Sequence, residues 1–204
     1  MSYEELLKIV ISDIPINPQE KPFGITFIAP PGIGKTTVSK ILSKKTGIYI
    51  TANDKIRRIV EEYGIDPEKN HKLVEQLAND RTVYMLENKT NMIIDANMQF
   101  FWESAQNNFK NHNASLYFIK LVCEEAEIIR RIKEREKNFG KDPENYSRAP
   151  VELYYKYKEK LKNSTFPEEL VFYTIDMNQS QEKIEMEIDK LVEKLTGEKN
   201  NEQD

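Results

Sequence analysis

The sequence predicts a three-layer α/β sandwich, in which a five-stranded, mainly parallel sheet lies between two layers of helices. Apolar, strand-like runs alternate with helical segments along most of the chain, as in doubly wound sheets. Two of these runs, 92–94 and 115–122, are almost continuously apolar, as strands covered on both faces of a parallel sheet must be. A glycine-containing turn joins the first strand to its helix, and ligands bind at such carboxyl ends of strands.

The strands and helices can be assigned in order along the chain. A capping box formed by Ser2 and Glu5 predicts a short first helix, and a proline-rich stretch then leads to residue 23. We expect strands at 25–28, 48–50, 92–94, 115–122 and 170–175. Helices are expected at 36–45, around 56–60, at 72–88, 124–137 and 152–162, and finally along an apolar stripe of Ile184, Ile188, Leu191 and Leu195. This pattern predicts one domain, 24–196, with an N-terminal helix and proline-rich lead-in at 1–23 and a polar tail at 197–204.

Composition narrows the class of protein. The chain has 204 residues, 39% of them hydrophobic and 31% charged, which is typical of a soluble globular domain. Its net charge of −4, from 30 basic and 34 acidic side chains, argues against an extended nucleic-acid surface. No apolar run approaches the roughly 20 residues of a membrane span. The single cysteine and the acidic N-terminus favour a cytoplasmic protein.

The turn after the first strand carries the clearest motif. Residues 29–36 read Ala-Pro-Pro-Gly-Ile-Gly-Lys-Thr and fit the phosphate-loop pattern G-x-x-x-x-G-K-[ST], except that Ala29 replaces the first glycine. The two glycines let successive amides point at phosphate oxygens, and the following helix adds its positive end. Lys35 is expected to reach the β- and γ-phosphates and Thr36 to ligate Mg²⁺. The predicted nucleotide-binding residues are Pro31, Gly32, Ile33, Gly34, Lys35, Thr36 and Thr37.

Further polar residues follow the other strands. The second strand is followed by Asp54-x-x-Arg57, the third ends in Asp95-x-Asn97, and the fourth leads to a helix that carries Arg131 and Arg135. Arg148 lies near the end of a segment, 138–150, that is rich in charges and helix breakers. Arg131 and Arg135 are four positions apart and therefore share one helical face.

In the order and spacing of these motifs, residues 24–175 resemble a group of P-loop kinases. The group includes polynucleotide 5′-hydroxyl kinases, zeta toxins, chloramphenicol phosphotransferase and gluconate kinase. The resemblance implies a P-loop NTPase fold with a small helical lid at about 131–150, and a kinase that uses ATP and Mg²⁺ to phosphorylate a hydroxyl acceptor. Lys35, Asp54, Arg131 and Arg135 would be catalytic, with Asp54 as the base. Arg57, Asp95, Asn97 and Arg148 would bind the acceptor, and Asp95 would also serve the metal.

Several alternatives stay open at this point. Asp54 could cap the following helix, and Arg131 and Arg135 could belong to a solvated basic face paired with glutamates. The enzyme could instead be a nucleoside monophosphate kinase of the adenylate kinase type. A nucleotide-binding regulatory or toxin module with little turnover is the alternative outside enzymes. Sugars, nucleosides, nucleic-acid ends and small antibiotics all fit as the acceptor, and nothing in the sequence indicates an oligomeric state or a preference for ATP over GTP.

Overall fold

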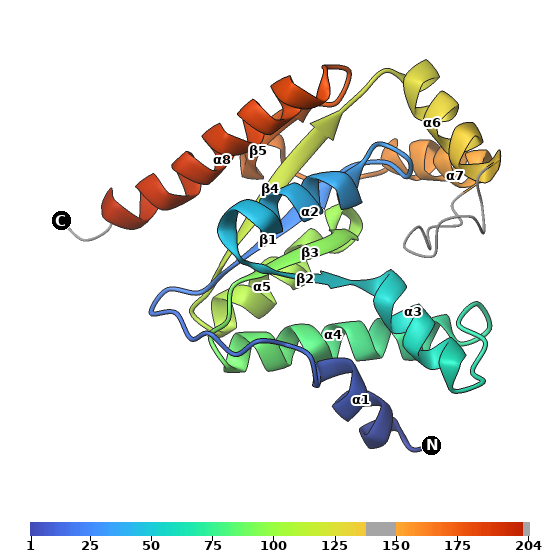
Figure 1. The fold of residues 1–204 in the computed structure, drawn as a ribbon, viewed down its shortest axis with the longest axis vertical. Coiled ribbons are helices and arrows are strands. Elements are labelled where there is room, and N and C mark those ends of the chain that lie inside the picture. Colours follow the sequence, from blue (N-terminus) through green and yellow to red (C-terminus); the bar gives the residue numbers. More distant parts are fainter. Residues whose placement is uncertain (138–149, 202–204) are drawn as a thin grey trace. The chain divides into compact units, whose positions relative to one another are not determined.

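A computed structural model describes residues 1–137 and 150–201, with side chains up to residue 197. Its centre is a five-stranded parallel sheet with the order β2-β3-β1-β4-β5, which confirms the predicted α/β fold (Figure 1). The strands are β1 (Phe23–Ile28), β2 (Tyr49–Ala52), β3 (Met92–Asn97), β4 (Ser115–Val122) and β5 (Val171–Asp176). All six residues of β1 are buried, as expected for a central strand with both faces covered.

The helices follow the strands in the predicted alternation. They are α1 (Tyr3–Ile11), α2 (Lys35–Thr46), α3 (Asn53–Glu62), α4 (His71–Glu87), α5 (Trp102–Asn111), α6 (Glu125–Lys137), α7 (Val151–Leu161) and α8 (Gln181–Asn201). Two short 3-10 turns lie at Gln99–Phe101 and Glu168–Leu170. The part of the chain that the structure describes has no helix long and apolar enough to cross a membrane.

The chain divides into two compact units. Unit 1 comprises residues 1–26, 48–96 and 101–117, and unit 2 comprises 27–47, 97–100 and 118–204. The sequence predicts a single domain and no such division. The division cannot be read from a single boundary in the sequence, because each unit is built from three separate segments of the chain.

In unit 1, the N-terminal helix is part of the core. α1 lies beside α3 and α4 (Figure 1). Its Leu6 and Val10 are buried in one cluster with Ile56 and Val60 of α3 and Val74 and Leu77 of α4. The predicted capping box at Ser2 is present, and the Tyr3 hydroxyl donates to an Asp80 carboxylate oxygen at 2.5 Å. The N-terminal helix therefore packs on the body of unit 1.

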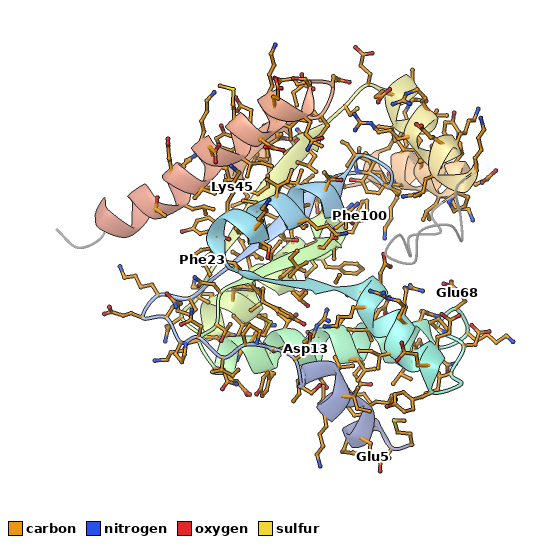
Figure 2. All side chains as sticks on the ribbon, viewed as in Figure 1. Glu5, Asp13, Phe23, Lys45, Glu68 and Phe100 are labelled. Carbon is orange, nitrogen blue, oxygen red and sulfur yellow. The ribbon has the colours of Figure 1, made fainter. Side chains whose placement is uncertain are left out.

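In unit 2, α8 packs against α2 and β5 (Figure 1). The stripe Ile184, Ile188, Leu191 and Leu195 is buried, which confirms it as a core face. An ion pair of 2.6 Å joins Lys45 of α2, labelled in Figure 2, to Asp189 of α8. The last helix runs to Asn201 and so covers part of the polar tail predicted at 197–204.

One helix was not predicted from the sequence. α5 buries Ala105 and Phe109, which lie four positions apart on one face. Asparagine, serine and glutamine fill much of the rest of the helix, so its apolar period is weak. The predicted lid, 131–150, begins in α6 and ends at the start of α7, and its loop at 138–149 lies outside the described residues.

Candidate functional site

The phosphate loop leaves a buried strand and turns at two glycines. Gly32 has φ +84° and Gly34 has φ +113°, a left-handed backbone that other residues rarely adopt. Ala29 is 1% exposed and has no positive φ, so this small residue fits where the motif usually has glycine. The departure at Ala29 therefore leaves the loop geometry intact.

The helix after the loop begins without any acidic or capping side chain. Gly34 is the N-cap of α2 and makes no side-chain cap hydrogen bond. The first turn of α2 contains no acidic residue. The first amides of a helix need partners and carry its positive end. Thr36 and Thr37 are exposed at this end. This part of unit 2 therefore has the geometry of an anion site.

α6 supports the phosphate loop from behind. A Cβ added at Gly32 would meet the Ile132 side chain, with the Cδ1 atom at 2.8 Å, so the loop lies directly against this helix. Arg131 donates from Nη1 to the Ile33 carbonyl at 3.0 Å and from Nη2 to the Met177 carbonyl at 2.8 Å. Its Nε donates to Glu127 at 2.8 Å. Arg131 thus ties α6 to the loop backbone.

The Arg131 carboxylate partner is strongly ionised. Hydrogen bonds from Arg130 and then from Arg131 lower the pKa of Glu127 to about 2. Glu127 therefore carries its charge at every physiological pH and holds the guanidinium of Arg131 in place. The sequence left Arg131 either catalytic or paired with glutamates on a solvated face. In the structure its Nε is paired with Glu127, while its Nη1 and Nη2 donate to backbone carbonyls.

A second side chain reaches the loop from the end of β3. Asn97 donates from Nδ2 to the Ala29 carbonyl at 3.2 Å and accepts at Oδ1 from the Gln99 amide at 3.1 Å. Asn97 was predicted to bind the acceptor, and the structure shows its amide holding the loop. Lys35 lies on the same loop, with Nζ 3.4 Å from the Pro30 carbonyl.

In unit 1, the predicted acceptor residues gather at the ends of β2 and β3. Ala52, the last residue of β2, pairs in register with Asp95 of β3. Asp54 stands in the first turn of α3, and Arg57 lies three positions further on. Asp54, Arg57 and Asp95 thus belong to one end of the β2–β3 pair.

The structure corrects the capping interpretation of Asp54. The N-cap of α3 is Ala52, and α3 has no side-chain cap hydrogen bond. Asp54 has no hydrogen bond or ion pair with another residue that the structure describes. Its carboxylate sits at the positive end of a helix, where a negative charge is favoured. Arg57, in contrast, donates from Nη1 to Glu68 at 2.7 Å.

The remaining predicted residues are placed in part. Arg135 stands in the last turn of α6, and Arg148 lies outside the described residues. Within residues 1–137 and 150–201 no three His, Cys, Asp or Glu side chains gather as a metal cage. Thr36 in unit 2 and Asp95 in unit 1 each carry an oxygen atom of the kind that Mg²⁺ accepts as a ligand.

Sequence reasoning missed two polar residues. Arg81 is 1% exposed in α4 and donates from Nη2 to the Ala52 carbonyl at 3.1 Å, at the start of α3. Gln99 is 6% exposed and bonds to both Tyr157 and Ser164. The one available signal was an arginine that interrupts the apolar stripe Val74, Leu77 and Met85.

Several solved structures share this fold. A chain of the PezAT chromosomal toxin–antitoxin system of Streptococcus pneumoniae aligns with a TM-score of 0.63 at 13% identity, over 87% of this chain and 77% of that chain. Shikimate kinase from Bacteroides thetaiotaomicron aligns with a TM-score of 0.55 at 17% identity, over 85% and 98%. A gluconokinase from Sinorhizobium meliloti 1021 aligns with a TM-score of 0.53 at 15% identity, over 89% and 99%. These similarities confirm that the fold resembles that of P-loop kinases, as the sequence predicted.

No curated protein matches the sequence. A family model described as AAA domain matches residues 25–152, which hold most of β1, the phosphate loop and the strands β2, β3 and β4. This match spans more than half of the chain. The chain therefore belongs to the AAA domain family.

Proposed function

We propose that this protein is an ATP- and Mg²⁺-dependent kinase that transfers the γ-phosphoryl group to a hydroxyl of a small-molecule or nucleotide-like acceptor. The observation that carries the proposal is the phosphate loop, which has two glycines in the left-handed region. It leads into a helix whose first turn has no capping side chain and no acidic residue. Such a cradle binds the phosphates of a nucleotide. The similar folds that carry the names shikimate kinase and gluconokinase support a kinase over other P-loop proteins.

The loop residues would hold the nucleotide. Amides of residues 32–37 donate to phosphate oxygens, and Lys35 neutralises charge on the β- and γ-phosphates. Mg²⁺, held by Thr36 with Asp95 as a further oxygen ligand, would stabilise the negative charge of the phosphates. Arg131 positions the loop through the Ile33 carbonyl, while Arg135 and Arg148 remain the candidates for contact with the transferring group.

Asp54 is the proposed general base. The acceptor oxygen forms a bond to the γ-phosphorus as the bond from that phosphorus to the ADP oxygen breaks, and Asp54 takes the hydroxyl proton. The half-buried position of Asp54 at a helix start, without a partner among the described residues, supports this role. Arg57, Asp95 and Asn97 are the proposed acceptor contacts.

The test is consumption of Mg²⁺-ATP by the purified protein, alone and with acceptor panels. One panel holds nucleosides, sugars and 5′-hydroxyl oligonucleotides, and a second holds nucleoside monophosphates. We expect a hydroxyl compound to stimulate turnover, and the Lys35→Ala variant to lose the stimulation. Stimulation only by monophosphates would replace the proposal with a nucleoside monophosphate kinase. ATP binding without stimulation by any acceptor would support a regulatory or toxin module.

A further inference from the structure

Four segments of unit 1 meet where β2 passes into α3, at the turn that carries Asp54. They are the lead-in after α1, β2, the first turn of α3, and α4. These segments contribute, in that order, the polar side chains of Asp13, Tyr49, Lys55 and Arg81. All of them, like Asp54, belong to unit 1.

The start of α3 is not fixed by a capping side chain. Ala52 is the N-cap, and α3 has no side-chain cap hydrogen bond. The first amides of such a helix lack the partner that a polar N-cap residue supplies. Asp54 stands in this first turn, and its carboxylate has no hydrogen bond or ion pair with another described residue. The contacts of its neighbours must therefore hold it in place.

Arg81 holds the backbone before Asp54. Its Nη2 donates to the Ala52 carbonyl at 3.1 Å, two positions before the carboxylate. The side chain is 1% exposed, and its Nε and Nη1 have no hydrogen-bond partner among the described residues. A buried guanidinium with so few partners is unfavourable for stability. Its contact with the β2–α3 turn is therefore a better reason for its presence than the stability of the fold.

A group of three side chains holds the turn after Asp54. Lys55 donates to an Asp13 carboxylate oxygen and, at 3.2 Å, to the Tyr49 hydroxyl. The Tyr49 hydroxyl donates to the same oxygen of Asp13, labelled in Figure 2, at 2.9 Å. An isolated ion pair at the surface stabilises little, but these groups come from three separate segments and fix one another's geometry.

The contacts on the two sides of Asp54 are connected electrostatically. Burial lowers the pKa of Arg81 from 12.5 to about 10, while Tyr49 and Asp13 act in the opposite direction. The Asp13 carboxylate therefore favours the charged form of Arg81 as well as pairing with Lys55. Loss of the Asp13 carboxylate would disturb both contacts at once.

We propose that Asp13 positions Asp54, the proposed base, by fixing the backbone on both sides of it. Lys55 and Tyr49 carry this effect on one side and Arg81 on the other, while the base itself stays unpaired. The proposal rests on the kinase function proposed above. A general base must lie within about 2.6–3.2 Å of the proton donor that it serves, and a displacement of about 1 Å can lower turnover about 10²-fold.

Two variants that break one ion pair each separate this role from general stability. Asp13→Ala removes the carboxylate at a side chain that is 43% exposed, so the variant should fold. Asp189→Ala is the matched control, because it breaks the 2.6 Å pair with Lys45 in unit 2, whose side chains are 30% and 55% exposed. Lys55→Arg retains a cation for Asp13. Circular dichroism and thermal unfolding check that each variant folds.

The experiment has two readouts. Hydrogen–deuterium exchange is followed at amides 56–58, whose hydrogen bonds close the first turn of α3. Steady-state turnover of Mg²⁺-ATP is measured with the panel compound that most stimulates the unchanged protein. Asp13→Ala should speed this exchange and lower kcat, each at least tenfold, without changing KM for ATP. Asp189→Ala should change none of these, and Lys55→Arg should keep kcat within about threefold.

A double variant tests whether the pair acts as a unit. Adding Lys55→Met to Asp13→Ala should lower kcat no further than Asp13→Ala alone, because both changes break the same contact. A further loss equal to that of Lys55→Met by itself would mean that Lys55 acts independently, and it would overturn the proposal.

The other outcomes distinguish this proposal from the kinase function. If an acceptor stimulates ATP consumption and Asp13→Ala leaves kcat unchanged, the kinase function stands and the positioning role fails, whatever the exchange rate. An equal loss of kcat in Asp189→Ala also overturns that role, because the cause is then general destabilisation. If no acceptor stimulates ATP consumption, the kinase function falls. Faster exchange in Asp13→Ala would then assign these contacts to the stability of α3 alone.

Discussion

Arg81 is an almost fully buried charge, and replacing it with methionine should not destabilise the protein. The guanidinium is 1% exposed, and its Nε and Nη1 atoms have no hydrogen-bond partner among the described residues. Desolvation lowers the pKa of Arg81 from 12.5 to about 10, and nearby Tyr49 and Asp13 offset this only in part. Burial therefore disfavours the charged form of this side chain in the folded state.

The size of the effect follows from the pKa shift and the single hydrogen bond. A fall from 12.5 to about 10 corresponds to a cost of about 3 kcal/mol whenever the group is protonated in both states. The hydrogen bond from Nη2 to the Ala52 carbonyl offsets about 1–3 kcal/mol of this cost. Methionine has a similar reach and no charge, so Arg81→Met should leave the free energy of unfolding unchanged or raise it by about 2 kcal/mol.

Urea unfolding followed by circular dichroism measures this difference. The folded pKa is depressed, so the penalty is complete below about pH 10 and is relieved only as pH rises from there towards 12.5. The gain in Arg81→Met should therefore be the same at pH 6 and pH 9. Arg58→Met, at an exposed position of α3, is the control and should lie within about 0.5 kcal/mol of the unchanged protein. A loss of more than about 2 kcal/mol in Arg81→Met would refute the reasoning, because it would mean that the arginine is a net stabilising group.

Three other changes test the site and the core. Gly32→Ala should lower ATP affinity at least tenfold in a fluorescent-nucleotide titration, because Gly32 has a φ of +84° and an added Cβ would meet the Ile132 side chain of α6. Gly64→Ala is the control: Gly64 has a φ of +77° but no neighbour within 4 Å, so this variant should bind ATP normally. Asp54→Asn should lower acceptor-dependent turnover by about 10²–10⁴ with ATP binding unchanged, and unaltered turnover would rule out Asp54 as the base. Leu6→Ala, at a position only 2% exposed, should lower the free energy of unfolding by about 2–5 kcal/mol in urea, while Ile16→Ala, at 45% exposed, serves as the surface control. A Leu6→Ala protein as stable as its control would mean that α1 does not belong to the core.

The elements that the sequence predicted well are those with strong local signals. The run 115–122 was predicted with the bounds that β4 has, because its apolar residues form a nearly continuous run, of which Phe118, Ile119 and Leu121 are buried. α8 was predicted from a regular stripe of four aliphatic residues, all of which are buried. α5 was missed because its packing face is short and its other positions are polar.

In the candidate site, too, the features that were predicted are the local ones. The phosphate loop, the uncapped start of α2 and the position of Asp54 after a strand are local features, since glycine dihedrals, helix ends and strand ends depend on neighbouring residues. The sequence therefore determined the fold class, the phosphate-loop segment and the order of the polar motifs.

Only the tertiary structure decided which side chains support that segment. Arg131 meets the Ile33 carbonyl across 98 positions of sequence, and Asn97 meets that of Ala29 across 68. The burial of Arg81 and the contacts of Asp13 with Tyr49 and Lys55 also arise from packing between distant segments. A hydrogen bond between distant residues depends on how whole helices and strands pack, and the identity of one residue does not encode that arrangement.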